Sequence, residues 1–102
     1  MEPQSPTFSF QVAPELAAGR YSNMLGVWHS PHEFTLDFAV TMPVVHADGA
    51  DGPPTVPCEV VARIKVSPSL IFDLLRALNE NMTQYEQNFG EIKRPEPPGG
   101  PS

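Results

Sequence analysis

The chain has little cysteine and little positive charge. Cys58 is its single cysteine, so no disulfide can form within the chain. Six basic residues stand against twelve acidic ones, for a formal net charge of -6. A protein that binds the phosphate backbone of nucleic acids needs clustered lysine and arginine, so nucleic acid is not an expected partner.

Long apolar runs are also absent. No stretch approaches the roughly 20 apolar residues that a membrane-spanning helix needs. The segment Met1 to Gln4 has neither the basic part nor the apolar part of a signal peptide. We therefore expect a cytoplasmic protein that does not bind membranes.

Both ends of the chain are rich in proline and poor in apolar residues. Such segments bury too little surface to offset the entropy that they lose on ordering. We predict disordered tails over residues 1–6 and 93–102, and a single domain over residues 7–92 with a flexible loop at 43–57. Because a domain of this size is only marginally stable alone, we expect a homodimer or a higher oligomer.

Alternating apolar residues predict the strands. Phe8 to Val12 alternates with polar residues, which is typical of a short half-buried strand. Tyr21 to His29 has apolar residues on both faces, so we expect both faces to be covered. After a turn at Ser30 to His32, Glu33 to Met42 alternates strictly, which predicts one core face and one polar face. Cys58 to Val66 repeats this alternation, with Cys58 on its apolar face.

A long helix follows the last strand. Ser67 and Pro68 predict its start, because a serine hydroxyl can cap free N–H groups and proline is favourable at the first helical position. An apolar stripe then runs from Ile71 to Phe89. Gly90 follows at the position where a left-handed cap is favourable.

The predicted fold is α+β, an antiparallel sheet of three to four strands followed by one long C-terminal helix. Leu70 and Phe72 flank the helical stripe and extend it beyond the width that one sheet face would cover. Val61 interrupts the polar face of its strand. These three residues indicate contact surfaces beyond the sheet-facing core.

Two segments of the chain resemble a bacterial family known as domain-of-unknown-function family 3467: they are YSNMLGVWHSPHEFTLDFAVTMP and VARIKVSPSLIFDLLRALNENMTQYEQNFGEI. The resemblance covers Ala13 to Ile92 apart from Val44 to Pro57, and it implies no activity. Members of the family join their central strands by a short connection, so the long loop is a departure. The order of elements is also similar to that of SecB-like export chaperones, in topology and acidic charge only.

Few groupings could carry chemistry. His29 and His32 flank a proline turn, which does not direct both imidazoles to one point, and His46 lies on the flexible loop with too few ligands for a calcium site. The chain has no GxSxG, P-loop or GxGxxG motif, and no motif places a histidine to activate Cys58. We expect neither an enzyme nor a cofactor or metal.

Asp37 lies between apolar neighbours and is expected to face Arg63 across the sheet. Two interpretations stay open. The residues form either a cross-strand ion pair on a wet face or a buried pair that organises a subunit interface.

The sequence predicts a non-catalytic, homo-oligomeric protein-interaction module, and it does not identify a partner other than the chain itself. The candidate interface residues are Tyr21, Met24, Trp28, Val61, Leu70 and Phe72. The first three could instead belong to the core or recognise another protein, since aromatic and methionine side chains are enriched at interfaces. The alternative function is a SecB-like holdase chaperone that binds unfolded polypeptides.

Overall fold

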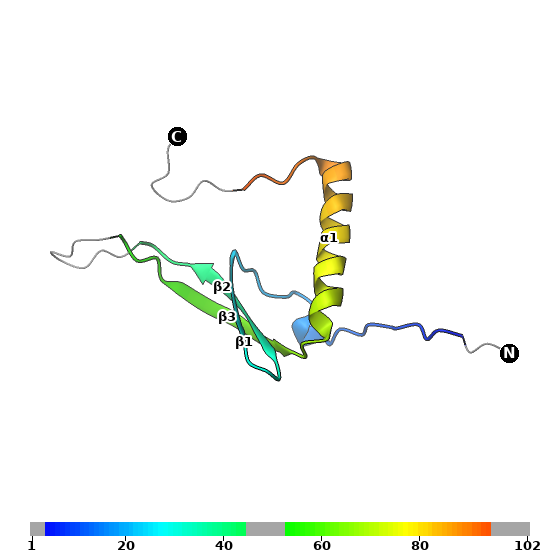
Figure 1. The fold of residues 1–102 in the computed structure, drawn as a ribbon. Helices are drawn as coiled ribbons and strands as arrows, with labels where there is room; N and C mark the ends of the chain where they lie inside the picture. Colours follow the sequence, from blue (N-terminus) through cyan, green and yellow to red (C-terminus); the bar gives the residue numbers. More distant parts are fainter. Residues whose placement is uncertain (1–3, 45–52, 95–102) are drawn as a thin grey trace. The chain divides into compact units, whose positions relative to one another are not determined.

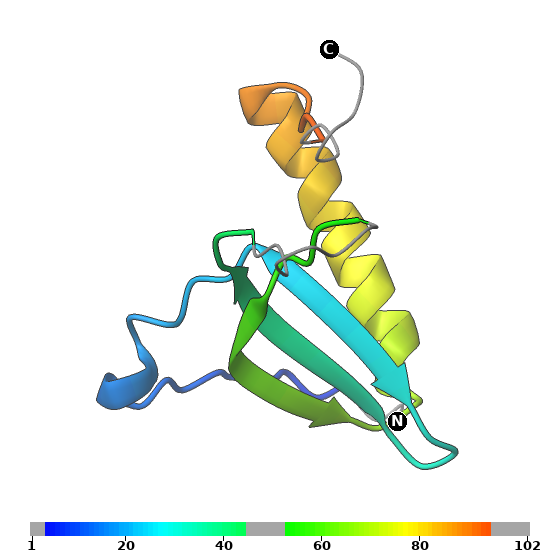
Figure 2. The same cartoon turned by 90° about the vertical axis from the view of Figure 1, so that its left-hand side faces the viewer.

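The computed structural model describes residues 4–44 and 53–94. It contains a 3₁₀ helix at Pro14–Leu16, strands β1 (Met24–His29), β2 (Phe34–Thr41) and β3 (Cys58–Val66), and helix α1 (Leu70–Phe89). The strands form one antiparallel sheet in the order β1-β2-β3, with β2 in the centre (Figure 1, Figure 2). The fold is the predicted α+β arrangement with three strands. Most of the predicted tails and of the loop at 43–57 lies outside the described residues.

The chain forms two compact units. The first contains the chain up to Val27 together with Leu36–Ile64, and the second contains Trp28–Thr35 together with the chain from Lys65 onward. The first unit therefore holds the 3₁₀ helix and most of the sheet. The second holds the turn between β1 and β2 and all of α1.

The segment before the 3₁₀ helix forms no strand, so the strand predicted at Phe8 to Val12 is wrong for the single chain. Phe8 is 83% exposed and Phe10 is 92% exposed. A strand needs a neighbour to satisfy its backbone groups, and no described strand of this chain pairs with the segment. The first regular hydrogen bond follows it, from the Leu16 N–H to the Ala13 carbonyl at 2.9 Å.

The predicted turn between β1 and β2 is present. The Ser30 N–H donates to the Glu33 carbonyl at 2.9 Å, and the His32 N–H donates to the Ser30 hydroxyl at 3.2 Å. Pro31 occupies a position where its preset φ favours the turn and its missing N–H costs no ladder hydrogen bond. The turn therefore closes a short hairpin.

The centre of β2 is covered on both faces, which corrects the prediction of one core face and one polar face. Leu36 is buried on one face, and Thr35, Asp37 and Ala39 are buried on the other. Because β2 is the central strand, longer side chains of its neighbours, such as Arg63, cover its smaller residues. Burial here follows from strand order as well as from polarity.

The expected core face of β3 is not covered, and the prediction of an inward Cys58 is wrong. Cys58, Val60 and Ile64 are exposed, because β3 is an edge strand with a neighbour on one side only. Among the described residues, Leu36 and Ala39 are the buried apolar side chains. The single chain thus buries very little apolar surface.

Helix α1 starts without the predicted serine cap. The N–H groups of Leu70 and Ile71 donate to the carbonyls of Ser67 and Pro68 at 3.0 and 3.2 Å. Ser69 already has helical dihedrals, its side chain makes no cap hydrogen bond, and its hydroxyl lies 3.2 Å from that of Ser67. A tight backbone turn, rather than a side chain, therefore opens the helix.

The predicted end of α1 at Gly90 is confirmed. Gly90 has a φ of 96°, and its N–H donates to the Glu86 carbonyl at 2.9 Å. None of the residues of α1 is buried. In the two described stretches of the chain, no helix has both the length and the hydropathy of a membrane span.

Candidate interaction surfaces

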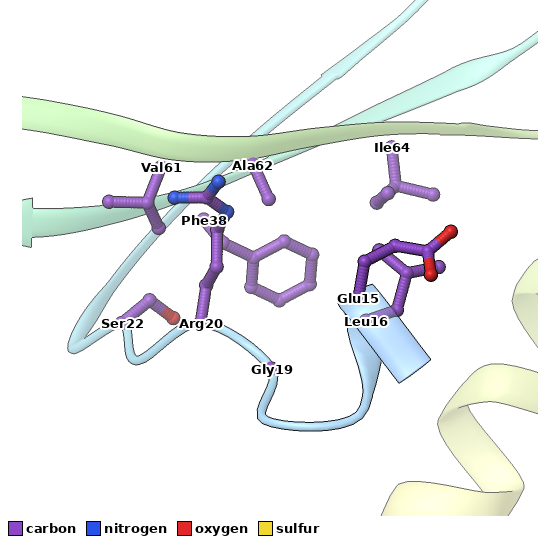
Figure 3. A pocket seen from close by; sticks show the side chains of 9 residues that line it. All are labelled: Glu15, Leu16, Gly19, Arg20, Ser22, Phe38, Val61, Ala62 and Ile64. Carbon is purple, nitrogen blue, oxygen red and sulfur yellow. The ribbon is translucent and has the colours of Figure 1, made fainter. Parts of the chain in front are cut away.

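The first unit contains an open cavity of about 540 Å³ on one face of the sheet (Figure 3). Its volume lies in the range of about 300–1,000 Å³ that small-molecule sites occupy. Strands β2 and β3 form one wall, and the 3₁₀ helix with the turn after it forms the other. The lining residues are Glu15, Leu16, Gly19, Arg20, Ser22, Phe38, Val61, Ala62 and Ile64.

The turn that forms the outer wall depends on its proline and its glycine. Pro14 occupies the first turn of the 3₁₀ helix, where its missing N–H costs nothing. Gly19 has a φ of 70°, a conformation that side chains with a Cβ rarely adopt, and its N–H donates to the Leu16 carbonyl at 3.0 Å. Together they reverse the chain so that Leu16 and Arg20 face the sheet (Figure 3).

The lining of the cavity combines an apolar wall with two charged side chains. Phe38, Ala62 and Ile64 make its sheet wall apolar, while Glu15 and Arg20 bring one charge of each sign. Arg20 makes no ion pair with another described residue. The lining also contains the hydroxyl group of Ser22. The cavity can accept an apolar group and can neutralise an acidic one.

Asp37 and Arg63 form a bidentate ion pair between β2 and β3. The Arg63 Nε donates to Asp37 Oδ1 at 2.6 Å, and Nη2 donates to Oδ2 at 2.9 Å. The Asp37 side chain is only 8% exposed, whereas that of Arg63 is 58% exposed. The hydrogen bonds that Arg63 donates to Asp37, together with the negative charge of that carboxylate, raise the pKa of Arg63, so the guanidinium stays protonated. The pair combines features of both predicted alternatives, since one partner is buried and the other reaches water.

A second ion pair, with more exposed partners, joins β3 to Glu33, the residue just before β2. The Lys65 Nζ donates to Glu33 Oε1 at 2.7 Å, and both side chains are largely accessible to water. Exposed pairs contribute about 0–1 kcal/mol, because solvent screens them and ordering them costs entropy. We expect this pair to add little to stability.

The six candidate interface residues are partly or fully exposed in the single chain. Tyr21, Met24 and Val61 belong to the first unit, and Val61 lines its cavity. The second unit contains Trp28, Leu70 and Phe72, all exposed. Their role at an interface stays a prediction.

The histidines form no metal site in the part of the chain that the structure describes. The His29 ring lies 5.7 Å from the Phe34 ring, between centroids, and His32 takes part in the turn through its backbone N–H. Within residues 4–44 and 53–94, no three histidine, cysteine or acidic side chains converge. The loop residue His46 lies outside the described residues.

Sequence reasoning missed the role of Asn23. The Asn23 N–H donates to the Ala39 carbonyl at 3.0 Å, its Oδ1 accepts the Thr41 N–H at 3.0 Å, and its Nδ2 lies 3.4 Å from the Thr41 hydroxyl. The side chain of Asn23, just before the first residue of β1, thus continues the hydrogen bonding to the end of β2. An asparagine just before a strand could have indicated this, because its amide can replace a backbone peptide group.

The fold and these surfaces define a small α+β protein with a shallow apolar cavity. The chain belongs to the family described as protein of unknown function (DUF3467), whose model matches residues 2–94. This match confirms the resemblance of the two sequence segments and also includes the exposed residues Phe8 to Val12. No curated protein and no solved structure matches the chain.

Proposed function

We propose that the chain is a non-catalytic, homo-oligomeric protein-interaction module. The observation that carries this proposal is the small apolar core of the single chain, in which Leu36 and Ala39 are the buried apolar residues of the described part. Folding must offset roughly 1–2 kcal/mol of backbone entropy for each ordered residue, mainly by burying apolar surface. A second copy of the chain is the simplest source of the missing burial.

Helix α1 supports the same proposal. It is amphipathic over 20 residues, yet Leu75, Leu78 and Met82 on its apolar stripe are exposed, and Phe72 beside the stripe is 80% exposed. Fully burying one such side chain stabilises a protein by about 1.5–3 kcal/mol. Burial of this stripe and its flank in an assembly would therefore supply a large part of the stability.

The test is the mass of the full chain in solution. Sedimentation equilibrium at micromolar concentrations should give a dimer or a larger assembly. The midpoint of urea unfolding should rise with protein concentration, because association stabilises the folded state by mass action. Added salt should tighten the assembly, since copies with a net charge of -6 repel each other and salt screens that repulsion. A folded monomer at all concentrations would contradict the proposal.

A second candidate function is holdase-like binding of unfolded polypeptides. Exposed aromatic residues in both units, together with the acidic charge of the chain, favour it. The purified protein should then suppress the aggregation of several unrelated unfolded clients at stoichiometric amounts. An assembly that forms but leaves client aggregation unchanged would eliminate this candidate and leave the first one intact.

A further inference from the structure

The segment Thr7 to Ala13, here called the arm, has the sequence of a strand and no strand partner. Phe8, Phe10 and Val12 alternate with polar residues, and all three are exposed, Val12 by 64%. Within the described chain, the arm joins no sheet and makes no hydrogen bond to a strand (Figure 1). Its backbone groups and its aromatic side chains are available to a partner.

The first unit also has an unprotected sheet edge. Strand β1 lies at one side of the sheet, and its residues Met24–Val27 belong to the same unit as the arm. Edge strands usually carry charged residues or proline that prevent pairing with another chain. Strand β3, at the other edge, has Glu59, Arg63 and Lys65, whereas β1 has no lysine, arginine, acidic residue or proline.

We propose that the arm of one copy adds as a strand to the β1 edge of a second copy. This inference rests on the proposed self-association and specifies how it occurs. Strand addition satisfies the backbone groups of both segments, and the alternate side chains of the arm provide the specificity. Each copy has one arm and one β1 edge with no further strand beside it among the described residues, so reciprocal exchange closes a symmetric dimer.

The lengths of the two segments agree. At about 3.3 Å per residue, the seven arm residues span about 23 Å and the six residues of β1 about 20 Å. Neither segment contains a lysine, an arginine or an acidic residue, so their pairing buries no ammonium, guanidinium or carboxylate group.

The apolar area is sufficient for a stable dimer. A buried aromatic side chain removes about 150–250 Å² from water, so the exposed fractions of Phe8 and Phe10 in two arms amount to about 700 Å². The two edges that they cover lose a similar area. The total of about 1,400 Å² lies within the 1,200–2,000 Å² of standard protein interfaces.

Sedimentation equilibrium of full-length variants tests the proposal. The double variant Phe8→Asp/Phe10→Asp places two carboxylates on the apolar face of the arm, and we expect the dissociation constant to rise about 100-fold or more. The matched control, Ser9→Asp/Gln11→Asp, adds the same charge to the opposite face of the same arm. It should change the dissociation constant by less than about tenfold. Since these side chains are exposed in the single chain, neither variant removes a packing contact within it.

The outcomes separate the two proposals. A monomeric wild-type protein would overturn both. An oligomeric wild type with an unchanged dissociation constant in Phe8→Asp/Phe10→Asp, or with equal losses in both double variants, would overturn the arm exchange and leave self-association intact.

Cross-linking between different copies provides an independent measurement. All copies carry Cys58→Ser, which removes the native thiol. One set also carries Ser9→Cys or Phe10→Cys, one position for each face of the arm, and the other set carries Leu25→Cys. The two sets are mixed, and the mixture is oxidised mildly. Paired residues on adjacent strands have Cβ atoms about 4.5–5.5 Å apart, close enough for a disulfide after small shifts. We expect a mixed disulfide with one of the two arm variants. Efficient cross-linking of Leu25→Cys copies to one another, without a mixed disulfide, would overturn the proposal, because it would show β1 paired with β1.

Discussion

Replacing Asp37 by asparagine tests the central ion pair of the sheet. The substitution keeps the size of the side chain, removes its charge and exchanges one acceptor oxygen for an NH₂ group that faces the guanidinium of Arg63. A hydrogen bond that involves a charged group contributes about 1.5–3 kcal/mol, and the Asp37 carboxylate accepts two of them in a buried position. We expect Asp37→Asn to lower the free energy of unfolding by about 2 kcal/mol, which is about 10 °C in Tm for a domain of this size.

The matched control is Glu33→Gln in the second ion pair. It makes the same chemical change in an ion pair between β3 and the residue just before β2, but the Glu33 side chain is 42% exposed. We expect a loss below about 0.5 kcal/mol, because water replaces the lost interaction. Burial of the carboxylate is therefore the variable that separates the two variants.

Urea unfolding followed by far-UV circular dichroism is the assay, at one protein concentration for all variants because association couples stability to concentration. Equal losses in Asp37→Asn and Glu33→Gln would refute the reasoning. If Asp37→Asn fails to fold, the double variant Asp37→Leu/Arg63→Met decides the point. Removal of both partners should restore folding, since neither charge of the ion pair is then left without the other.

Substitutions at three further residues test separate features. Gly90→Ala should cost about 1 kcal/mol in urea unfolding, since a φ of 96° is strained for alanine although no atom lies within 4 Å of the added Cβ. Asn23→Ala should lower the free energy of unfolding by about 1 kcal/mol in the same assay, because it removes the side-chain hydrogen bonds to Thr41. Asn23→Asp keeps the acceptor for the Thr41 N–H and should lower it by less. Phe72→Asp should weaken the assembly about 100-fold in sedimentation with native helicity retained, because a carboxylate would be desolvated at an interface. An unchanged assembly would show that Phe72 lies outside the interface.

Local patterns predicted the elements of this fold well. The alternation in Phe34–Thr41 and Cys58–Val66 and the stripe of α1 reflect the periods of strand and helix, which depend on the backbone of each element alone. Gly90 ends the helix as predicted, since the requirement for a positive φ is also local. These features need no knowledge of which elements are neighbours.

Burial could not be predicted in the same way, because it depends on strand order. Thr35 and Asp37 lie on the same face of β2 and have polar side chains, but both are buried because β2 is the central strand. Cys58 has the pattern of a core residue but is exposed on an edge strand. The arm residue Phe10 has the pattern of a strand, and the single chain offers it no partner.

The candidate site was only partly visible in the sequence. The pairing of Asp37 with Arg63 was expected from their faces on two alternating strands, whereas the geometry of the pair required the structure. The cavity was not expected, because residues distant in sequence form its two walls: Leu16 and Arg20 on one side, and Ile64 on the other.

The buried ion pair also bears on how β2 and β3 align during folding. Successive side chains of a strand point to opposite faces, so a slip of β3 by one residue would turn Arg63 to the other face of the sheet. The Asp37 carboxylate would then be buried without its charged partner, which is costly in a low-dielectric interior. A slip by two residues would keep the alternating apolar residues of β3 on their face, but it would still move Arg63 away from the buried carboxylate of Asp37. Asp37 and Arg63 therefore select one register for the sheet among several of comparable hydrophobicity.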